Sequence, residues 1–181
     1  MAVLTPQQRT TLESAVQLAR KTAEQGAFNA LHAMAVDHPE PFGYMDAKQR
    51  SLRNRLRSKA RLLGDELQSN GIQGINNLSY ELAYETWHKM LFAKFLEANN
   101  LLMHPDGVAV TMQDCEELAI EEGCVDKWDA AANYASRMLP AIFRIDDPLM
   151  QVPFATDDRI KLEGIIDELE TSIFIADDAL G

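Results

Sequence analysis

The stretch NNLSYELAYETWHKMLFAKFLEANNLL, residues 76–102, decides how this chain folds. At 3.6 residues per turn, its apolar side chains cover most of the circumference of a helix instead of a single stripe. Only Glu81, Glu85 and His88 fall on a narrow polar strip. Such a helix needs partners on nearly every side, so the stretch predicts a central, buried helix at about residues 76–100.

The segment before this helix also carries helical signals. Thr5 and Gln8 have the form of a capping box with Pro6 at the first helical position, which predicts a helix that continues, kinked near Gly26, to about residue 36. Asp46 is expected to cap a second helix that runs to about residue 69. Turns are predicted between these elements, where proline and glycine cluster at residues 37–44 and glycine recurs at residues 70–74.

The segment after the central helix continues the same pattern. Thr111 is expected to cap a short helix at residues 113–122 that stops at Gly123. Asp126 and Thr156 are expected to open two further helices. The chain is therefore predicted to be all-α, an irregular multi-helix bundle around the central helix.

The last residues predict that the chain is a fragment. Residues 173–175 (Ile-Phe-Ile) could form a short extended piece. Residues 176–181 resemble the capped start of another helix, yet the sequence ends there. We therefore expect residues 1–181 to form a single helical N-terminal domain of a longer protein.

Length and composition indicate one globular domain. The chain has 181 residues, of which 46% are hydrophobic and 25% charged. No run approaches the roughly 20 apolar residues of a membrane span, and the start lacks a signal-peptide pattern. This predicts a cytoplasmic protein without membrane contact. Cys115 and Cys124 have no histidine nearby, so they indicate reduced thiols and neither a zinc site nor a disulfide.

Charge is distributed unevenly along the chain. The formal net charge is -11, but residues 47–63 contain no acidic residue and seven of the seventeen basic ones. If Asp46 caps a helix here, its apolar residues fall on one face, and elsewhere on the helix Arg50, Arg53, Arg57 and Arg61 form a ridge.

This basic ridge has two interpretations. Four guanidinium groups on successive turns could follow the phosphates of a nucleic acid and release counterions. The simpler interpretation is that they pair with the many acidic side chains of this protein or remain solvated. No aromatic residue interleaves the arginines, so any nucleic-acid contact would involve the backbone without sequence readout. The candidate nucleic-acid-binding residues are Lys48, Arg50, Arg53, Arg57 and Arg61.

Catalytic motifs are missing from the sequence. It has no glycine-rich cofactor loop and no serine elbow, and residues 147–150 (Asp-Pro-Leu-Met) lack the second proline and the aromatic ring of an Asp-Pro-Pro-Tyr motif. Glu85 and His88 have the Glu-x-x-His spacing of di-iron carboxylate bundles, which would make the protein a metal enzyme, but a second copy is absent. We therefore assign no catalytic, cofactor-binding or metal-binding residue, and interpret Glu81, Glu85 and His88 as a hydrogen-bonding strip.

Residues 82–102 (LAYETWHKMLFAKFLEANNLL) carry a resemblance to a known family. They are similar to the helix that precedes the catalytic domain of large adenine-specific DNA methyltransferases, in which a pattern Ala-Tyr-x-x-Trp/Phe followed by Phe-x-Glu-x-Asn recurs. Glu97 and Asn99 or Asn100 stand at the end of the pattern here. Residues 115–119, 135–143 and 173–181 also resemble these proteins, which include single-chain restriction-modification methylases and the methyltransferase of BREX phage-exclusion systems.

This resemblance implies that the chain is the N-terminal helical module of an enzyme that methylates the N6 amine of adenine in DNA. Such a parent protein would use S-adenosylmethionine, and its glycine-rich cofactor loop and Asn-Pro-Pro-Tyr-type motif would lie downstream. The expected partners are double-stranded DNA and the downstream methyltransferase domain. The alternative is a freestanding acidic helical module for protein–protein interaction, which would explain the charge and the absent motifs.

Overall fold

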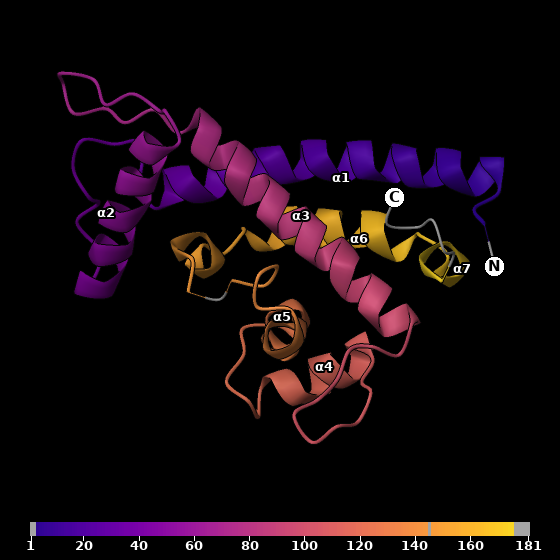
Figure 1. The fold of residues 1–181 in the computed structure, drawn as a ribbon. Coiled ribbons are helices and arrows are strands. Elements are labelled where there is room, and N and C mark those ends of the chain that lie inside the picture. Colours follow the sequence, from indigo (N-terminus) through magenta and orange to yellow (C-terminus); the bar gives the residue numbers. More distant parts are fainter. Residues whose placement is uncertain (1–2, 145, 176–181) are drawn as a thin grey trace. The chain divides into compact units, whose positions relative to one another are not determined.

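The computed structural model of the chain describes residues 3–144 and 146–175. Seven α-helices and one short 3-10 helix (η1) make up the regular structure of this part, and the only β pairing in it is two isolated bridges (Figure 1). The predicted all-α multi-helix fold is therefore confirmed. The elements are α1 (Pro6–Ala33), α2 (Ala47–Leu62), α3 (Asn76–Ala98), α4 (Met112–Ala119), α5 (Lys127–Met138), η1 (Pro148–Gln151), α6 (Thr156–Asp167) and α7 (Thr171–Phe174).

The described residues group into two compact units. Unit 1 takes its residues from Met1–Leu18, His88–Ile145 and Glu163–Gly181, and unit 2 from Ala19–Trp87 and Asp146–Leu162. Helices α1, α3 and α6 each contribute residues to both units. The expectation of a single domain over residues 1–181 stays a prediction.

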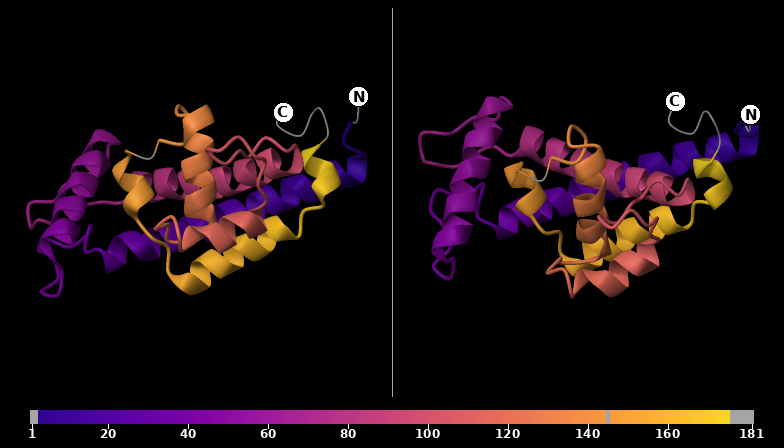
Figure 2. Two further views of the ribbon diagram at one scale, coloured as in Figure 1. Left: turned by 90° about the horizontal axis from the view of Figure 1, so that it is seen from below. Right: turned by 60° about the horizontal axis from the view of Figure 1, so that its bottom comes forward.

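Helix α1 begins as the sequence predicts and runs for 28 residues (Figure 2). The Thr5 hydroxyl accepts from the Gln8 amide at 3.2 Å, and the Gln8 side chain accepts from the Thr5 amide at 3.0 Å, which completes the capping box. The helix stays continuous through Gly26. A Cβ at this position would lie 2.8 Å from two ring carbons of Phe154, so the glycine permits close packing of the α6 entry segment.

Helix α3 matches the predicted central helix closely. Its first amides are capped from the preceding loop, because the Asp65 carboxylate accepts from Asn77 N at 3.0 Å and from Leu78 N at 2.9 Å. Leu78, Leu82, Ala83, Met90, Ala93 and Leu96 are buried. Tyr80 and Tyr84 are exposed, so this helix is covered on most sides but not on all of them.

Two loops of the chain share one conformation. Each begins with a left-handed residue, Gly64 or Asn100, whose hydrogen bonds form a Schellman motif at the end of α2 or α3. Each then makes one antiparallel bridge around a turn with a positive-φ glycine, and the next helix starts twelve residues after the left-handed residue. Equivalent positions differ by 36 residues, so the helix-loop-helix element is repeated.

Several predicted boundaries are corrected. Helix α2 ends at Leu62 and not near residue 69, because Gly64 adopts φ 94° and terminates it. Helix α4 ends at Ala119, although Gly123 closes the following turn as expected. The extended piece predicted at residues 173–175 is wrong, because Thr171–Phe174 forms a helical turn. The helix start predicted at residues 176–181 lies outside the described residues.

Apolar packing explains why residues 171–174 form the helical turn α7. Ile173 and Phe174 are buried together with Leu4 and Leu169 in one hydrophobic cluster of unit 1. The Asn99 side-chain amide also donates to the Phe174 carbonyl at 2.9 Å. A single helical turn brings both neighbouring apolar residues into this cluster, whereas an extended strand would point them to opposite sides.

Candidate nucleic-acid interface

Helix α2 presents the basic residues that the sequence singled out. It begins at a full capping box, in which the Asp46 carboxylate accepts from Gln49 N at 2.8 Å and the Gln49 side chain accepts from Asp46 N at 2.9 Å. Lys59 and Arg61 lie in its last turn, where cations interact favourably with the helix dipole. Leu56 and Ala60 are completely buried, which fixes the rotation of the helix.

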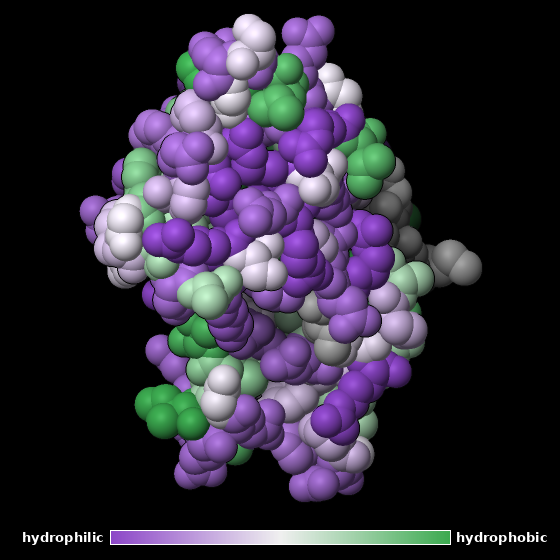
Figure 3. All heavy atoms as spheres, turned by 90° about the vertical axis from the view of Figure 1, so that its left-hand side faces the viewer, coloured by the Kyte–Doolittle hydropathy of each residue, from purple (hydrophilic) through white to green (hydrophobic). Residues whose placement is uncertain are grey.

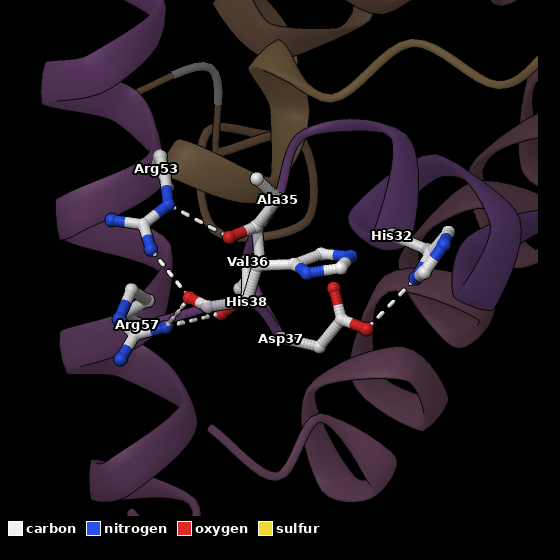
Figure 4. A network of polar contacts seen from close by, with 7 residues as sticks. All are labelled: His32, Ala35, Val36, Asp37, His38, Arg53 and Arg57. Atoms are coloured by element: carbon white, nitrogen blue, oxygen red, sulfur yellow. Dashed lines mark hydrogen bonds and ion pairs between the residues drawn. The ribbon is translucent and has the colours of Figure 1, made fainter. Parts of the chain in front are cut away.

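Two of the predicted binding residues, Arg53 and Arg57, are buried and hold backbone carbonyls (Figure 4). We call them the arginine pair. Arg53 donates to the carbonyls of Ala35, His38 and Pro39, at 2.7, 2.5 and 3.1 Å. Arg57 donates to those of Val36, His38 and Gly71, at 2.8, 2.5 and 2.8 Å. The two side chains are only 4% and 9% exposed.

The end of α1 explains why arginine is needed at these positions. Ala35 adopts φ 54° and completes a Schellman motif, in which Val36 N donates to Leu31 O at 3.1 Å and Ala35 N to His32 O at 2.9 Å. The chain then turns, and the carbonyls of residues 35–39 lack a helical partner. The planar guanidinium groups supply several donors each in a fixed geometry. Burial lowers the pKa of both arginines.

The four-arginine ridge predicted from sequence is therefore interrupted in its middle. Lys48, Arg50 and Arg61 remain exposed, and Arg55 joins them. Within the described residues, none of these four side chains forms an ion pair, so the predicted pairing with acidic side chains is not observed for them. Lys59, in contrast, pairs with Asp147 at 2.5 Å.

A shallow open groove follows the solvent side of α2. Its polar lining residues are Ser51, Asn54 and Ser58, next to basic side chains of the same helix. Apolar residues line it as well, namely Ala47, Leu62, Leu63 and Pro148 of η1. Figure 3 shows that hydrophilic residues cover most of the face that carries α2. We call this feature the α2 groove; its basic residues are Arg50, Arg55 and Lys59.

The structure also brings together three residues that the sequence analysis did not combine. His32, in the last turn of α1, lies beside Asp37 and His38 in the following loop (Figure 4). We call this group the His-Asp-His cluster. The sequence signal for it is two histidines and an aspartate within seven residues, a spacing that does not follow the Glu-x-x-His pattern. The Schellman motif at Ala35 folds these positions back onto one another.

The polar strip of α3 and the two cysteines, which the sequence analysis also singled out, lie outside the α2 groove and the His-Asp-His cluster. Glu81, Glu85 and His88 are half-buried on α3 and do not enter a three-residue group of metal-ligating side chains in the described part of the chain. Cys115 is buried, and burial raises its pKa to about 12. Cys124 is half-buried and free, so the two thiols are unpaired as predicted.

No helix of the described residues has the length and apolar character needed to cross a membrane. The chain matches no protein-family model, no curated protein and no solved structure. The fold thus places it among all-α multi-helix proteins, and the resemblance to adenine-specific DNA methyltransferases stays a prediction.

Proposed function

We propose that this chain is the N-terminal helical module of an S-adenosylmethionine-dependent DNA adenine-N6 methyltransferase, and that its α2 groove contacts the DNA phosphate backbone. The family resemblance of residues 82–102 supports the first part of this proposal. The α2 groove supports the second. The module would work in the cytoplasm, brace the downstream catalytic domain and help to position the duplex. Restriction-modification and phage defence are the settings that the resemblance favours.

The observation that carries the DNA contact is the composition of the α2 groove. Two basic side chains that form no ion pair among the described residues, Arg50 and Arg55, line it together with small hydroxyl and amide groups and several apolar side chains. Lys59 also lines the groove, but its charge is already paired with Asp147. Hydroxyl, amide and guanidinium groups are the side chains that commonly donate to phosphate oxygens. The small size of Ser51, Asn54 and Ser58 would let a sugar-phosphate strand approach the helix. Lys48 and Arg61 extend the same positive charge toward the two ends of α2.

The arginine pair does not belong to this contact. Arg53 and Arg57 are buried and bonded to carbonyls, so reversing their charge would disrupt the fold and would not report on DNA. The informative double variant is Arg50→Glu/Arg55→Glu. Both side chains are exposed and lie along the groove. A matched control with the same change in charge is Arg20→Glu/Lys21→Glu, at two exposed positions on α1.

Fluorescence anisotropy with a labelled 25-base-pair duplex at several salt concentrations tests the contact. The wild-type chain should bind at low salt, with an affinity that falls as salt rises. Removing two phosphate contacts should weaken the slope of log K against log salt by about 2. The control variant should keep the wild-type slope. Its changed net charge should affect only the affinity itself. Equal slopes in all three proteins would refute the groove contact.

The gene itself tests the larger proposal. An open reading frame beyond codon 181 that encodes a glycine-rich loop and then an Asn-Pro-Pro-Tyr-type motif would support the methyltransferase assignment. A stop codon directly after Gly181 would refute it and favour the freestanding interaction module. The two tests are independent, because a chain without a catalytic domain could still bind DNA through the α2 groove.

A further inference from the structure

The His-Asp-His cluster has the geometry of an incomplete coordination shell. One nitrogen from each imidazole of His32 and His38 and one carboxylate oxygen of Asp37 lie within 4.8 Å of one another. His32 Nδ1 and Asp37 Oδ2 are 2.8 Å apart, and the two imidazole centroids are 5.0 Å apart. In a tetrahedral zinc site, bonds of about 2.1 Å place neighbouring ligand atoms roughly 3.4 Å apart. Small side-chain rotations would therefore bring all three ligands to one ion.

Two polar atoms of the cluster have no hydrogen-bond partner within the part of the chain that the structure describes. They are Asp37 Oδ1 and His38 Nε2, and both are buried from solvent. A buried carboxylate oxygen and a buried imidazole nitrogen without partners each carry a desolvation cost of roughly 1–3 kcal/mol. Both are also atoms that donate a lone pair to a metal ion. That both belong to one cluster points to a shared ligand.

The chemistry of the three donors selects the kind of ion. Two imidazoles and one carboxylate are typical of sites for zinc, iron and other divalent transition metals, whereas Mg²⁺ and Ca²⁺ prefer oxygen ligands alone. Three protein ligands leave a fourth position for water or a partner group. The filled d shell of Zn²⁺ imposes no coordination geometry, so Zn²⁺ readily accepts two imidazoles and one carboxylate.

The surroundings hold the cluster in place. The Phe28 ring stacks on His32 with a centroid distance of 6.5 Å, and the ring centroids of Phe42 and His38 lie 4.9 Å apart. The backbone carbonyl of Asp37 accepts from Gln73 N at 3.0 Å, and the arginine pair fixes the carbonyls on either side of it (Figure 4). The ligand-bearing loop is thus ordered from three directions.

We propose that His32, Asp37 and His38 bind one divalent transition-metal ion, Zn²⁺ by preference, at the end of α1. Bound metal would join the last turn of α1 to the loop that the arginine pair holds. It would also satisfy both buried atoms that have no partner. The site is separate from the α2 groove and does not depend on DNA binding.

Calorimetric titration of the full 181-residue chain with ZnCl₂, after chelator treatment and without an affinity tag, tests this proposal. We expect one ion per chain. His32→Gln, Asp37→Asn and His38→Gln should each weaken binding at least tenfold, because each removes one of three ligands. His88→Gln is the matched control, since it removes an imidazole outside the cluster and should leave the affinity unchanged. Excess Mg²⁺ should not compete.

Two further measurements keep the result interpretable if a variant folds poorly. Zn²⁺ should raise the melting temperature of the wild-type chain, which needs no variant. Co²⁺ should give the intense visible absorption of a four-coordinate site, and Zn²⁺ should abolish it. Absence of Zn²⁺ binding by the wild-type chain would overturn the proposal. Equal affinity in the His38→Gln and His88→Gln proteins would also overturn it.

Discussion

Replacing Arg57 with methionine should destabilise the protein substantially. Arg57 donates to three carbonyls, those of Val36, His38 and Gly71. The His38 carbonyl also accepts from Arg53, so it keeps a partner in the variant. The other two carbonyls lose the donor that the structure gives them. An orphaned buried acceptor costs about 1–3 kcal/mol, which applies in full to the Val36 carbonyl and only in part to the half-buried Gly71 carbonyl, so we expect a loss of about 2–4 kcal/mol in the free energy of unfolding.

The double variant provides a sharper test of this reasoning. Arg53→Met alone should also leave the shared His38 carbonyl satisfied, through Arg57. Only Arg53→Met/Arg57→Met removes both donors to it. The double variant should therefore lose about 1–3 kcal/mol more than the sum of the single variants. If the double variant loses only as much stability as the two single variants together, the shared-carbonyl explanation is contradicted.

Urea denaturation followed by circular dichroism measures these losses. The stability change is read from the shift of the midpoint, provided that the slope m is unchanged. Arg55→Met is the control, because Arg55 lies on the same helix but is exposed and should change stability by no more than about 0.5 kcal/mol. If Arg57→Met behaves like this control, the buried hydrogen bonds of the arginine pair do not stabilise the fold.

Four further predictions each concern a single position, and urea denaturation measures each effect. Gly26→Ala should cost about 1–3 kcal/mol because its Cβ would meet the Phe154 ring at 2.8 Å, whereas Gly164→Ala, with open space around it, should gain about 0.5–1 kcal/mol. Asp65→Ala should cost about 1–2 kcal/mol through loss of the α3 cap. Burial raises the pKa of Cys115 from 9.0 to about 12, so the unfolded thiol ionises first and stability should fall between pH 9 and 12. Wild-type protein should lose up to about 1.4 kcal/mol per pH unit more than Cys115→Ala in that interval; parallel pH profiles would contradict this cause.

Local signals in the sequence were sufficient for most helix starts. Asp46, Thr111 and Asp126 cap helices as predicted, because each side chain accepts from amides two or three residues away. The helix ends were predicted less accurately than the starts. Helix α1 ends at Ala33 because Ala35 adopts a left-handed conformation, for which alanine gives no sequence signal. The helical turn at Ile173 depends on contact with Leu4, far away in sequence.

The amino-acid sequence by itself determined the all-α class, because periodicity and capping act within one or two turns of the chain. It also determined the concentration of basic residues in α2. Only the tertiary structure decided which of them reach solvent, since Arg53 and Arg57 point toward carbonyls that the end of α1 leaves without partners. The same chain reversal assembles His32, Asp37 and His38. Such juxtapositions depend on how separate segments fold together, and helical periodicity carries no information about them.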